Sequence, residues 1–296
     1  MLDGKALAEK IRREHAPAVE ALRRRGRRLR LVALQVGSVA AAEAYLRGQR
    51  RGADAWGIDY ELRTLSKTAT EADVRAAIVA ANDDPGVTGV ILQLPLPEGL
   101  PARALQREIA PAKDVEGVHP ENLGHIVHGR EGLAPCTALA VIALLESSGA
   151  TIRGAEAVVV GHSEIVGKPV ALMLLARDAT TSVCHKFTKD LAAHTRTADL
   201  LVVAVGRAGL VKADMVKPGA IVVDVGINAT TGPDGKPRLV GDVDFDGLVA
   251  KGCLVTPVPG GVGPVTVAML LRNTVLAAQA TPAIEGDPTP LLFPEE

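Results

Sequence analysis

The sequence predicts an α/β fold of two domains, with a doubly wound sheet in the second. Three observations lead to this prediction. Short apolar runs rich in Val, Ile and Leu alternate with longer helical patterns along the chain. Glycine-bearing turns follow apolar runs in the second half, as they do in doubly wound sheets. A chain of 296 residues is also long for one compact core, so about two domains are expected.

The first half of the chain alternates regularly between helical and strand patterns. Gly26 is a suitable stop for the first helix, and Thr70 and Asp73 have capping-box spacing before the third. This order predicts a mainly parallel sheet with helices on both faces. The expected helices are 6–25, 40–56 and 70–82, and the expected strands are 29–36, 58–65 and 87–92.

A loop-rich stretch at 111–135 separates the two halves, and a helix at 137–148 is expected to bridge to the second domain. The segment 228–238 is rich in Gly, Pro, Thr and Asn, which predicts an exposed loop. The residues after about 280 carry four prolines and several acids, which predicts a poorly ordered tail. The other expected elements are strands at 157–160, 180–184, 199–205, 219–225 and 252–255 and helices at 164–176 and 265–280.

The composition argues against several classes of protein. A net charge of −1 gives no general attraction to nucleic acid or to an anionic membrane. The three cysteines are far apart in the sequence, so neither a disulfide framework nor a CxxC metal site is expected. No signal-like segment and no apolar run of roughly 18 residues is found. A cytoplasmic protein without membrane or nucleic-acid partners is therefore expected.

Two further clusters have simple structural explanations. The five arginines within 23–28 suit the C-terminus of a helix, where cations interact favourably with the dipole. His119, His125 and His128 have no cysteine or carboxylate partner at a familiar zinc spacing, so no metal is expected.

The segment 256–266, T-P-V-P-G-G-V-G-P-V-T, is the most distinctive in the chain. Three prolines and three glycines in eleven residues exclude a helix interior or a central strand. A rigid loop with bare glycine backbone that opens a helix suits the close approach of a flat ligand or a phosphate. A stiff connection between domains is the alternative.

A second glycine-bearing turn lies at 161–167. Gly161 follows an apolar strand and Gly167 falls in the first turn of the next helix, where backbone N–H groups can hold a pyrophosphate. An ordinary tight turn is the alternative. About twenty residues further on, an NAD site would offer an acid, but this chain has Lys186. With His162 and Lys168, this lysine favours NADP, although lysines are usually solvated surface charges.

Six motifs, taken in order, resemble those of the bifunctional methylenetetrahydrofolate dehydrogenase/methenyltetrahydrofolate cyclohydrolase (FolD) family. The resemblance extends from about residue 2 to residue 274. The motifs are Q-L-P-L-P at 93–97, K-D-V-E-G at 113–117, G-H-S-E-I-V-G-K-P at 161–169, V-D-V-G-I-N at 223–228, G-D-V at 241–243 and the loop at 256–266.

This resemblance implies the NADP-dependent oxidation of 5,10-methylenetetrahydrofolate to 5,10-methenyltetrahydrofolate. In the family, a second reaction hydrolyses that product to 10-formyltetrahydrofolate. The resemblance also implies a homodimer that binds tetrahydrofolate derivatives, with or without a polyglutamate tail. The implied domains are a folate-binding catalytic domain over 1–117 plus 265–296, to which the C-terminal helix returns, and a Rossmann-like NADP-binding domain over 118–264.

The family motifs also imply particular site residues. Tyr45 would stack on the pterin, Gln93 would contact the ligand and Asp114 would hydrogen-bond the aminopyrimidine ring. A half-buried helix residue, a loop-capping amide and a turn-forming Asp are the respective alternatives. The other substrate-binding positions expected are Pro259, Gly260, Gly261 and Pro264. The cofactor-binding positions expected are Gly161, His162, Ser163, Ile165, Val166, Gly167, Lys186, Gly206 and Ile227.

This sequence departs from the family pattern at four positions. Gln49 replaces the catalytic lysine of the motif S-x-x-Y-x-x-x-K, and Ala42 replaces its serine. Glu116 replaces an aspartate, and Ala138 replaces a proline. The residues expected to take part in catalysis are Tyr45, Gln49, Gln93, Asp114 and Glu116.

The departures predict that the dehydrogenase step survives while the cyclohydrolase step is crippled. Three other interpretations stay open at this point. Glu116 could serve as the base of a fully bifunctional enzyme. The chain could be an impaired homologue that acts as a binding partner, or another NADP dehydrogenase with a different small substrate.

Overall fold

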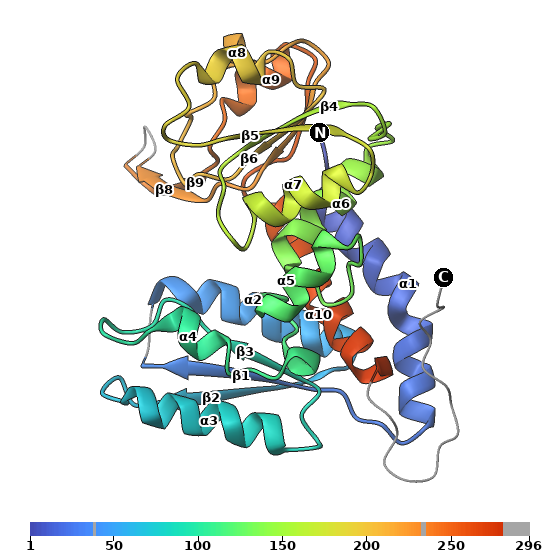
Figure 1. Ribbon diagram of the computed structural model, residues 1–296, viewed down its shortest axis with the longest axis vertical. Coiled ribbons are helices and arrows are strands. Elements are labelled where there is room, and N and C mark those ends of the chain that lie inside the picture. Colours follow the sequence, from blue (N-terminus) through green and yellow to red (C-terminus); the bar gives the residue numbers. More distant parts are fainter. Residues whose placement is uncertain (38–39, 232–234, 281–296) are drawn as a thin grey trace. The chain divides into compact units, whose positions relative to one another are not determined.

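The computed structural model describes residues 1–37, 40–231 and 235–280. The chain divides into two compact units, each built around a parallel sheet (Figure 1). Unit 1 comprises 1–10, 125–131 and 135–269, and unit 2 comprises 11–124, 132–134 and the residues from 270 onward. The predicted two-domain α/β class is confirmed. The predicted domain limits stay a prediction, and the tail at 281–296 lies outside the described residues.

Unit 2 is built on a three-stranded parallel sheet in the order β2-β1-β3. Its central strand β1 (Arg30–Val36) is almost wholly buried, which explains its continuous apolar run. Helices α2 (Ala40–Trp56) and α3 (Glu71–Asp83) lie on opposite faces of this sheet (Figure 1). The flanking strands are β2 (Asp59–Leu65) and β3 (Gly89–Leu92).

Local sequence signals explain where several elements of unit 2 begin. Thr70 caps α3, and Asp73 completes the predicted capping box by accepting from the Thr70 backbone N–H at 2.8 Å. The core on the α3 side joins alternate residues of β1 to one face of that helix. Its main members are Val32, Leu34, Val36, Val74, Ile78, Ala81, Val90 and Leu92.

The stretch 111–135 is more helical than predicted. It contains a short 3₁₀ turn, η1 (Pro111–Lys113), and the helix α5 (Pro120–Val127). Backbone N–H groups at the start of α5 are satisfied by local side chains: His119 N donates to Asp114 and Glu121 N to His119 Nδ1. Helix α5 is only eight residues long, too short to give a clear periodic pattern. The five-residue helix α4 (Ala102–Gln106) was missed for the same reason.

Unit 1 contains a five-stranded parallel sheet in the order β10-β7-β6-β4-β5. Helices α6 (Cys136–Ser147) and α7 (Gly167–Leu175) lie on one face, and α8 (Leu191–Thr195) and α9 (Phe245–Ala250) lie on the other (Figure 1). This is the doubly wound arrangement that the sequence predicts. The strands are β4 (Glu156–Val160), β5 (Thr180–Cys184), β6 (Leu200–Val203), β7 (Ile221–Asp224) and β10 (Leu254–Val255).

The prediction of a loop at 228–238 is wrong. Strands β8 (Asn228–Thr231) and β9 (Pro237–Val240) pair there as an antiparallel ribbon, with residues 232–234 outside the described part of the chain. The Asn228 side chain ties the ribbon's base by donating to Val240 O and Asp242 Oδ1 at 3.4 and 2.9 Å. Four-residue strands rich in Thr, Asn and Pro resemble a loop in composition, so the pattern concealed them.

Helices α1 (Gly4–Arg24) and α10 (Val262–Ala280) each contribute residues to both units. The latter part of α10 belongs to unit 2, as predicted for the C-terminal helix. There the fully buried Asn273 amide donates to Val115 O and Ala134 O, both at 3.0 Å. This one side chain therefore satisfies two buried carbonyl groups from different segments of the unit.

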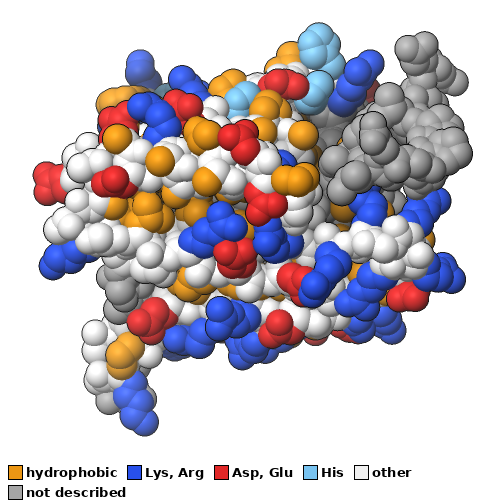
Figure 2. Space-filling view, turned by 90° about the horizontal axis from the view of Figure 1, so that it is seen from below, with side chains coloured by type: hydrophobic (Ala, Val, Ile, Leu, Met, Phe, Trp, Pro, Cys, Tyr) orange, Lys and Arg blue, Asp and Glu red, His pale blue; other side chains and the backbone are white. Residues whose placement is uncertain are grey.

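The charged side chains are well mixed on the surface. Figure 2 shows basic and acidic groups interspersed over the face seen from below. In unit 2, Arg63 Nε contacts Glu61 Oε1 at 2.6 Å, and Arg30 pairs with Asp84. Among the described residues, no helix has the length and apolar character needed to cross a bilayer.

Candidate functional site

The residues predicted to bind cofactor gather at one edge of the unit 1 sheet. Strands β4, β5, β6 and β7 are parallel, so their carboxyl ends share that edge. The turn at 161–167 follows β4, Lys186 follows β5, Gly206 follows β6 and Ile227 follows β7. Ile165 and Ile227 are 48% and 66% exposed there, and they could contact the face of a flat ring.

The turn after β4 is shaped by two glycines. Gly161 has a φ of 119°, and a Cβ on it would lie 2.3 Å from Ala204 O. A Cβ on Gly167 would lie 2.0 Å from Gly161 O. A side chain at Gly161 would therefore displace the residues after β6, and one at Gly167 would force the first turn of α7 away from the turn after β4. The Gly167 N–H donates to Ser163 Oγ at 3.4 Å, and Val166 stands at the N-cap position of α7. The Lys168 N–H donates to Ser163 O at 3.0 Å, and Pro169 has no N–H, so the first N–H groups of α7 already have partners within the turn.

A basic and aromatic cluster lies beside this turn. The rings of His162 and His185 are 5.1 Å apart, and Lys186 Nζ lies 4.8 Å from the centroid of the Phe187 ring. All four side chains are exposed, and Phe187 is 75% exposed. The two histidines come from loops after different strands, so the fold brings together what the sequence separates. Such a cluster offers positive charge and a ring for stacking.

Two aspartates that sequence reasoning left without a role organise the neighbouring loops. The Asp242 carboxylate accepts from the backbone N–H groups of Val205, Gly206 and Arg207 at 2.7–2.9 Å. Asp224 accepts from the N–H groups of Gly226, Asp242 and Val243 at 2.9–3.1 Å. Burial raises the pKa of Asp224 to about 6 despite these donors. Both aspartates lie within the family-like motifs at 223–228 and 241–243, which was the only signal for them.

The distinctive segment 256–266 also belongs to unit 1. It is a loop up to Gly261, and from Val262 onward it forms the first turn of α10, which begins earlier than the predicted residue 265. Thr256 anchors the start of the loop by accepting from Asp224 N at 2.8 Å, and Gly261 N donates to Pro257 O at 2.8 Å. A Cβ on Gly4 would lie 1.8 Å from Gly261 O, so the first turn of α1 approaches this loop closely. The segment holds the four expected substrate-binding positions Pro259, Gly260, Gly261 and Pro264, the last of them in the first turn of α10. Their contact with a ligand stays a prediction.

In unit 2, Gln49 is the centre of a buried polar cluster. Its Oε1 accepts from the Tyr60 hydroxyl and from Gln93 Nε2, both at 2.8 Å. Gln49 has no exposed surface, and Gln93 is 5% exposed just after β3. Tyr45 lies four residues before Gln49 on α2 and is 40% exposed. Gln49 and Gln93 are thus in direct contact, with Tyr45 on the same face of the helix.

Two carboxyl groups lie in the loop after η1. Asp114 is fully buried and accepts from Gly117 N, His119 N and Asn122 Nδ2 at 2.8–3.1 Å. Burial raises the pKa of Asp114, while these hydrogen bonds oppose the shift. Its carboxylate therefore shapes the turn, and its contact with a ligand stays a prediction. Asn122 is a member of this group that sequence reasoning missed.

Glu116 is partly exposed, yet its carboxyl group is strongly affected by its surroundings. Burial, and then the nearby Asp114, raise the pKa of Glu116 to about 8. Its charge is also felt by Tyr60, whose pKa is raised to about 12, mainly by burial. At neutral pH the Glu116 carboxyl therefore carries a proton that it could donate.

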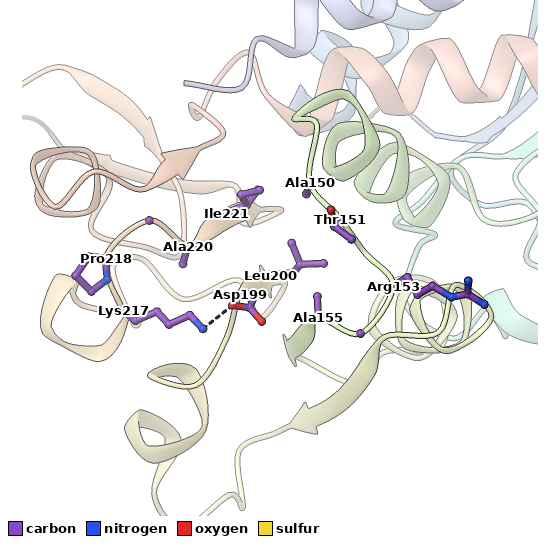
Figure 3. Close-up of a pocket in the computed structure, with 12 residues that line it drawn as sticks. Ala150, Thr151, Arg153, Ala155, Asp199, Leu200, Lys217, Pro218, Ala220 and Ile221 are labelled. Carbon is purple, nitrogen blue, oxygen red and sulfur yellow. Dashed lines mark hydrogen bonds and ion pairs between the residues drawn. The ribbon is translucent and has the colours of Figure 1, made fainter.

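An open cavity of about 410 Å³ lies at the opposite edge of the unit 1 sheet. Figure 3 shows Arg153, Asp199 and Lys217 at its rim. Lys217 Nζ already pairs with Asp199 Oδ1 at 2.6 Å. Ligands of open α/β sheets bind at the carboxyl ends of the strands, so this cavity is a weaker candidate. Among the described residues, no group of three or more His, Cys, Asp or Glu side chains is placed to hold a metal ion.

Comparison with known proteins covers both units. A model of the tetrahydrofolate dehydrogenase/cyclohydrolase catalytic domain matches residues 2–116. A model of the NAD(P)-binding domain of the same family matches residues 135–282. Together the two models match well over half of the chain.

Individual proteins agree with the family models. The chain is 52% identical over 248 residues to Bifunctional protein FolD 2 of Mesorhizobium japonicum, covering 84% of this chain and 81% of that protein. The crystal structure of the bifunctional enzyme FolD from Campylobacter jejuni matches with a TM-score of 0.89 and 43% identity, over 94% of this chain and 98% of that one. FolD from Trypanosoma brucei, solved with NADP cofactor and inhibitor, matches with a TM-score of 0.88 and 38% identity, over 94% and 97%.

Proposed function

Because the chain belongs to the tetrahydrofolate dehydrogenase/cyclohydrolase (FolD) family, we propose that it oxidises 5,10-methylenetetrahydrofolate to 5,10-methenyltetrahydrofolate with NADP as the hydride acceptor. The observation that carries this proposal is the match of both family domains to one chain. The enzyme is an oxidoreductase of folate one-carbon metabolism.

The residues at the carboxyl edge of the unit 1 sheet fit NADP. The glycine turn leaves no space for side chains at Gly161 and Gly167, so a pyrophosphate could approach the backbone of this turn closely. Lys186 and His162 would meet the extra phosphate of NADP, and Ile165 and Ile227 would contact a flat ring. When bound, NADP supplies the acceptor for the hydride. The protein supplies binding and orientation.

Removal of a hydride from the methylene bridge makes limited demands on protein side chains. The resulting cation is delocalised over two nitrogens, and no proton moves in this step. Alignment of the bridge carbon is the main requirement. Gln49, which replaces the family's lysine, has no titratable group but need not impair this step. The dehydrogenase reaction is therefore compatible with this substitution.

The cyclohydrolase reaction has different requirements. Water must lose a proton as it attacks the methenyl cation, and a ring nitrogen must gain a proton as the ring opens. Gln49 cannot exchange a proton at neutral pH, and Ala42 offers no hydroxyl. Loss of a general acid–base group typically lowers a rate by about 10²–10⁴. We therefore expect the methenyl product to accumulate during turnover.

One observation favours a second candidate, a fully bifunctional enzyme. Glu116 has a pKa of about 8 and lies close enough to Tyr60 to influence its pKa. Below pH 8 its carboxyl could give a proton to the ring nitrogen, and above pH 8 its carboxylate could take one from water. Under this alternative, Glu116→Gln abolishes hydrolysis of methenyltetrahydrofolate while hydride transfer persists.

The decisive experiment is an assay of folate-dependent reduction of NADP and, in parallel, of NAD. The proposed enzyme reduces NADP only when methylenetetrahydrofolate is present and prefers NADP over NAD. A purified, folded protein that binds NADP but reduces none with this substrate would overturn the proposal, leaving the binding-partner interpretation. Reduction of NADP with another small substrate would identify a different dehydrogenase. Following the methenyl absorbance in the same reaction separates the two candidates for the second step.

A further inference from the structure

The orientation of the Gln49 carboxamide is fixed by two donors from different elements. Tyr60 lies at the start of β2 and Gln93 lies just after β3, and both donate to Gln49 Oε1 at 2.8 Å. An amide oxygen has two lone pairs, so its capacity as an acceptor is filled. Because both donors select the oxygen, the NH₂ group must occupy the other side of the carboxamide.

That NH₂ group has no hydrogen-bond partner among the residues that the structure describes. Gln49 has no exposed surface, and a buried polar group left unsatisfied is costly and rare. The carboxamide thus retains two N–H donors for which the described residues provide no acceptor. An acceptor on a ligand, such as a carbonyl oxygen or a ring nitrogen, would satisfy them.

Tyr60 is the donor in this arrangement, because the Gln49 Oε1 atom that it contacts has no hydrogen to give. The Tyr60 pKa of about 12, raised mainly by burial, keeps the hydroxyl protonated throughout the neutral range. The Arg50 guanidinium lies 5.8 Å from the centroid of the Tyr60 ring and helps to hold the ring in place. Removing the Tyr60 hydroxyl would leave one lone pair of Gln49 Oε1 without a donor. The preference for the orientation in which Oε1 faces Tyr60 and Gln93 would then be weaker.

We infer that Tyr60 is a positioning residue for the folate, holding the Gln49 carboxamide so that its two N–H groups face an acceptor atom of the bound substrate. This inference rests on the proposed function. It also links the residue at position 49 to the one at position 60. A lysine ammonium has donors only, so it could not accept the hydrogen bond that Tyr60 donates to glutamine.

The test is a double-mutant cycle read by calorimetric binding of tetrahydrofolate. Tyr60→Phe is expected to weaken binding about three- to tenfold, and Gln49→Met about tenfold or more. Because the Tyr60 hydroxyl acts through Gln49, the double variant should bind no more weakly than Gln49→Met alone. In steady state, Tyr60→Phe should raise the KM for folate with little change in kcat, which indicates loss of uniform binding.

Two controls separate this effect from a general loss of structure. Thr68→Val also removes a single hydroxyl in unit 2, one that contacts Ser66 at an exposed turn, and should bind folate as wild type does. The chain's single tryptophan, Trp56, lies on α2 with Gln49 and is 8% exposed, so its fluorescence reports folding of that helix. Each variant should keep the emission of a buried tryptophan.

Several outcomes would overturn the inference. Wild-type affinity in Tyr60→Phe, or losses that add in the double variant, would show that Tyr60 does not act through Gln49. If Tyr60→Phe loses the emission of a buried Trp56, its binding data cannot be used, and the test then depends on Gln49→Met. Wild-type affinity of Gln49→Met for tetrahydrofolate would show that the substrate does not use the Gln49 N–H donors, and would overturn the inference. A wild-type protein that binds NADP but no tetrahydrofolate would instead overturn the proposed function itself.

Discussion

At the scale of single residues, the chain places unusual chemistry at a few positions in each unit. Gln49 is buried and accepts two hydrogen bonds, whereas Glu116 retains a proton at neutral pH. Lys186 brings a positive charge to the carboxyl edge of the unit 1 sheet, beside the paired rings of His162 and His185. These residues lead to three predictions that point substitutions can test.

Lys186→Asp should weaken NADP binding by about tenfold or more, because a negative charge would face the extra phosphate. It should also tighten NAD binding, because an acid at this position can hydrogen-bond the ribose hydroxyls. Calorimetric titration with both cofactors measures the change. Lys189→Asp is the matched control, since Lys189 is also an exposed lysine, three residues further along the loop. Equal use of NADP and NAD by the wild type would show that the charge argument is wrong.

Gln49→Lys should restore part of the hydrolysis of methenyltetrahydrofolate. A lysine can exchange a proton when its pKa is lowered, and a glutamine cannot. The measurement is the decay of methenyl absorbance above the buffer rate. Wild-type protein that already hydrolyses the compound rapidly, and loses this activity in Glu116→Gln, would favour the bifunctional candidate instead.

Glu116 should make the protein less stable as the pH rises. Its pKa is about 8 in the folded protein against an ordinary value of 4.5, so between these values the folded state holds a proton that the unfolded chain has lost. The stabilisation is complete below pH 4.5 and is lost as the pH rises through 8. Between pH 5 and pH 8.5, the free energy of unfolding of the wild type should fall by on the order of 3 kcal/mol relative to that of Glu116→Gln. Urea unfolding at the two pH values measures this change. A difference in the free energy of unfolding between wild type and Glu116→Gln that is the same at both pH values would contradict the prediction.

At the scale of elements, the doubly wound part of unit 1 depends on its loop anchors as much as on its strands. Asp242 binds three consecutive backbone N–H groups in the loop after β6, and Asp224 ties the turn after β7 to the residues after β9. Loops held in this way present a fixed surface to a cofactor.

Asp242→Asn should therefore lower both the stability and the NADP affinity. The substituted amide would place an NH₂ group against backbone donors and lose at least two charge-assisted hydrogen bonds. We expect a decrease of about 2–4 kcal/mol in the free energy of unfolding and roughly tenfold weaker NADP binding. Urea unfolding and calorimetry measure the two effects. Asp246→Asn, the same change at an exposed position on α9, should leave both values unchanged.

Elements with strong periodic or terminal signals were predicted well from the sequence. The helix at 40–56 and the strand at 180–184 have the predicted bounds, and the Thr70 capping box is present. Short elements without such signals were missed, namely α4, α5 and the ribbon of β8 and β9. The grouping of cofactor positions at one sheet edge followed from topology, because parallel strands end together.

Contacts between distant side chains could not be predicted in this way. Tyr60 meets Gln49 only because β2 packs beneath α2, and Asp242 meets residues more than thirty positions earlier in the chain. No local pattern encodes such distances. The scarcity of tyrosine, with two in the whole chain, was the one available hint that Tyr60 has a special position.

At the scale of the whole molecule, the family resemblance leads us to expect a homodimer. Light scattering at micromolar concentration should give a mass twice that of one chain. A stable monomer under these conditions would remove this expectation. The catalytic assays should then be repeated across a dilution series, because an activity that requires a dimer falls as the protein dissociates.

The interleaving of the two units along the chain has a consequence for how the protein is made. Residues from 270 onward belong to unit 2, although most of that unit precedes residue 125. Asn273 supplies the donors for two carbonyl groups buried in that unit. During synthesis, most of unit 2 is made first, but it cannot complete its fold until the final helix has been made. Unit 1 is made later, yet all of its residues are present once residue 269 has been added. A released chain truncated after residue 269 should protect unit 1 from protease and leave unit 2 open to cleavage.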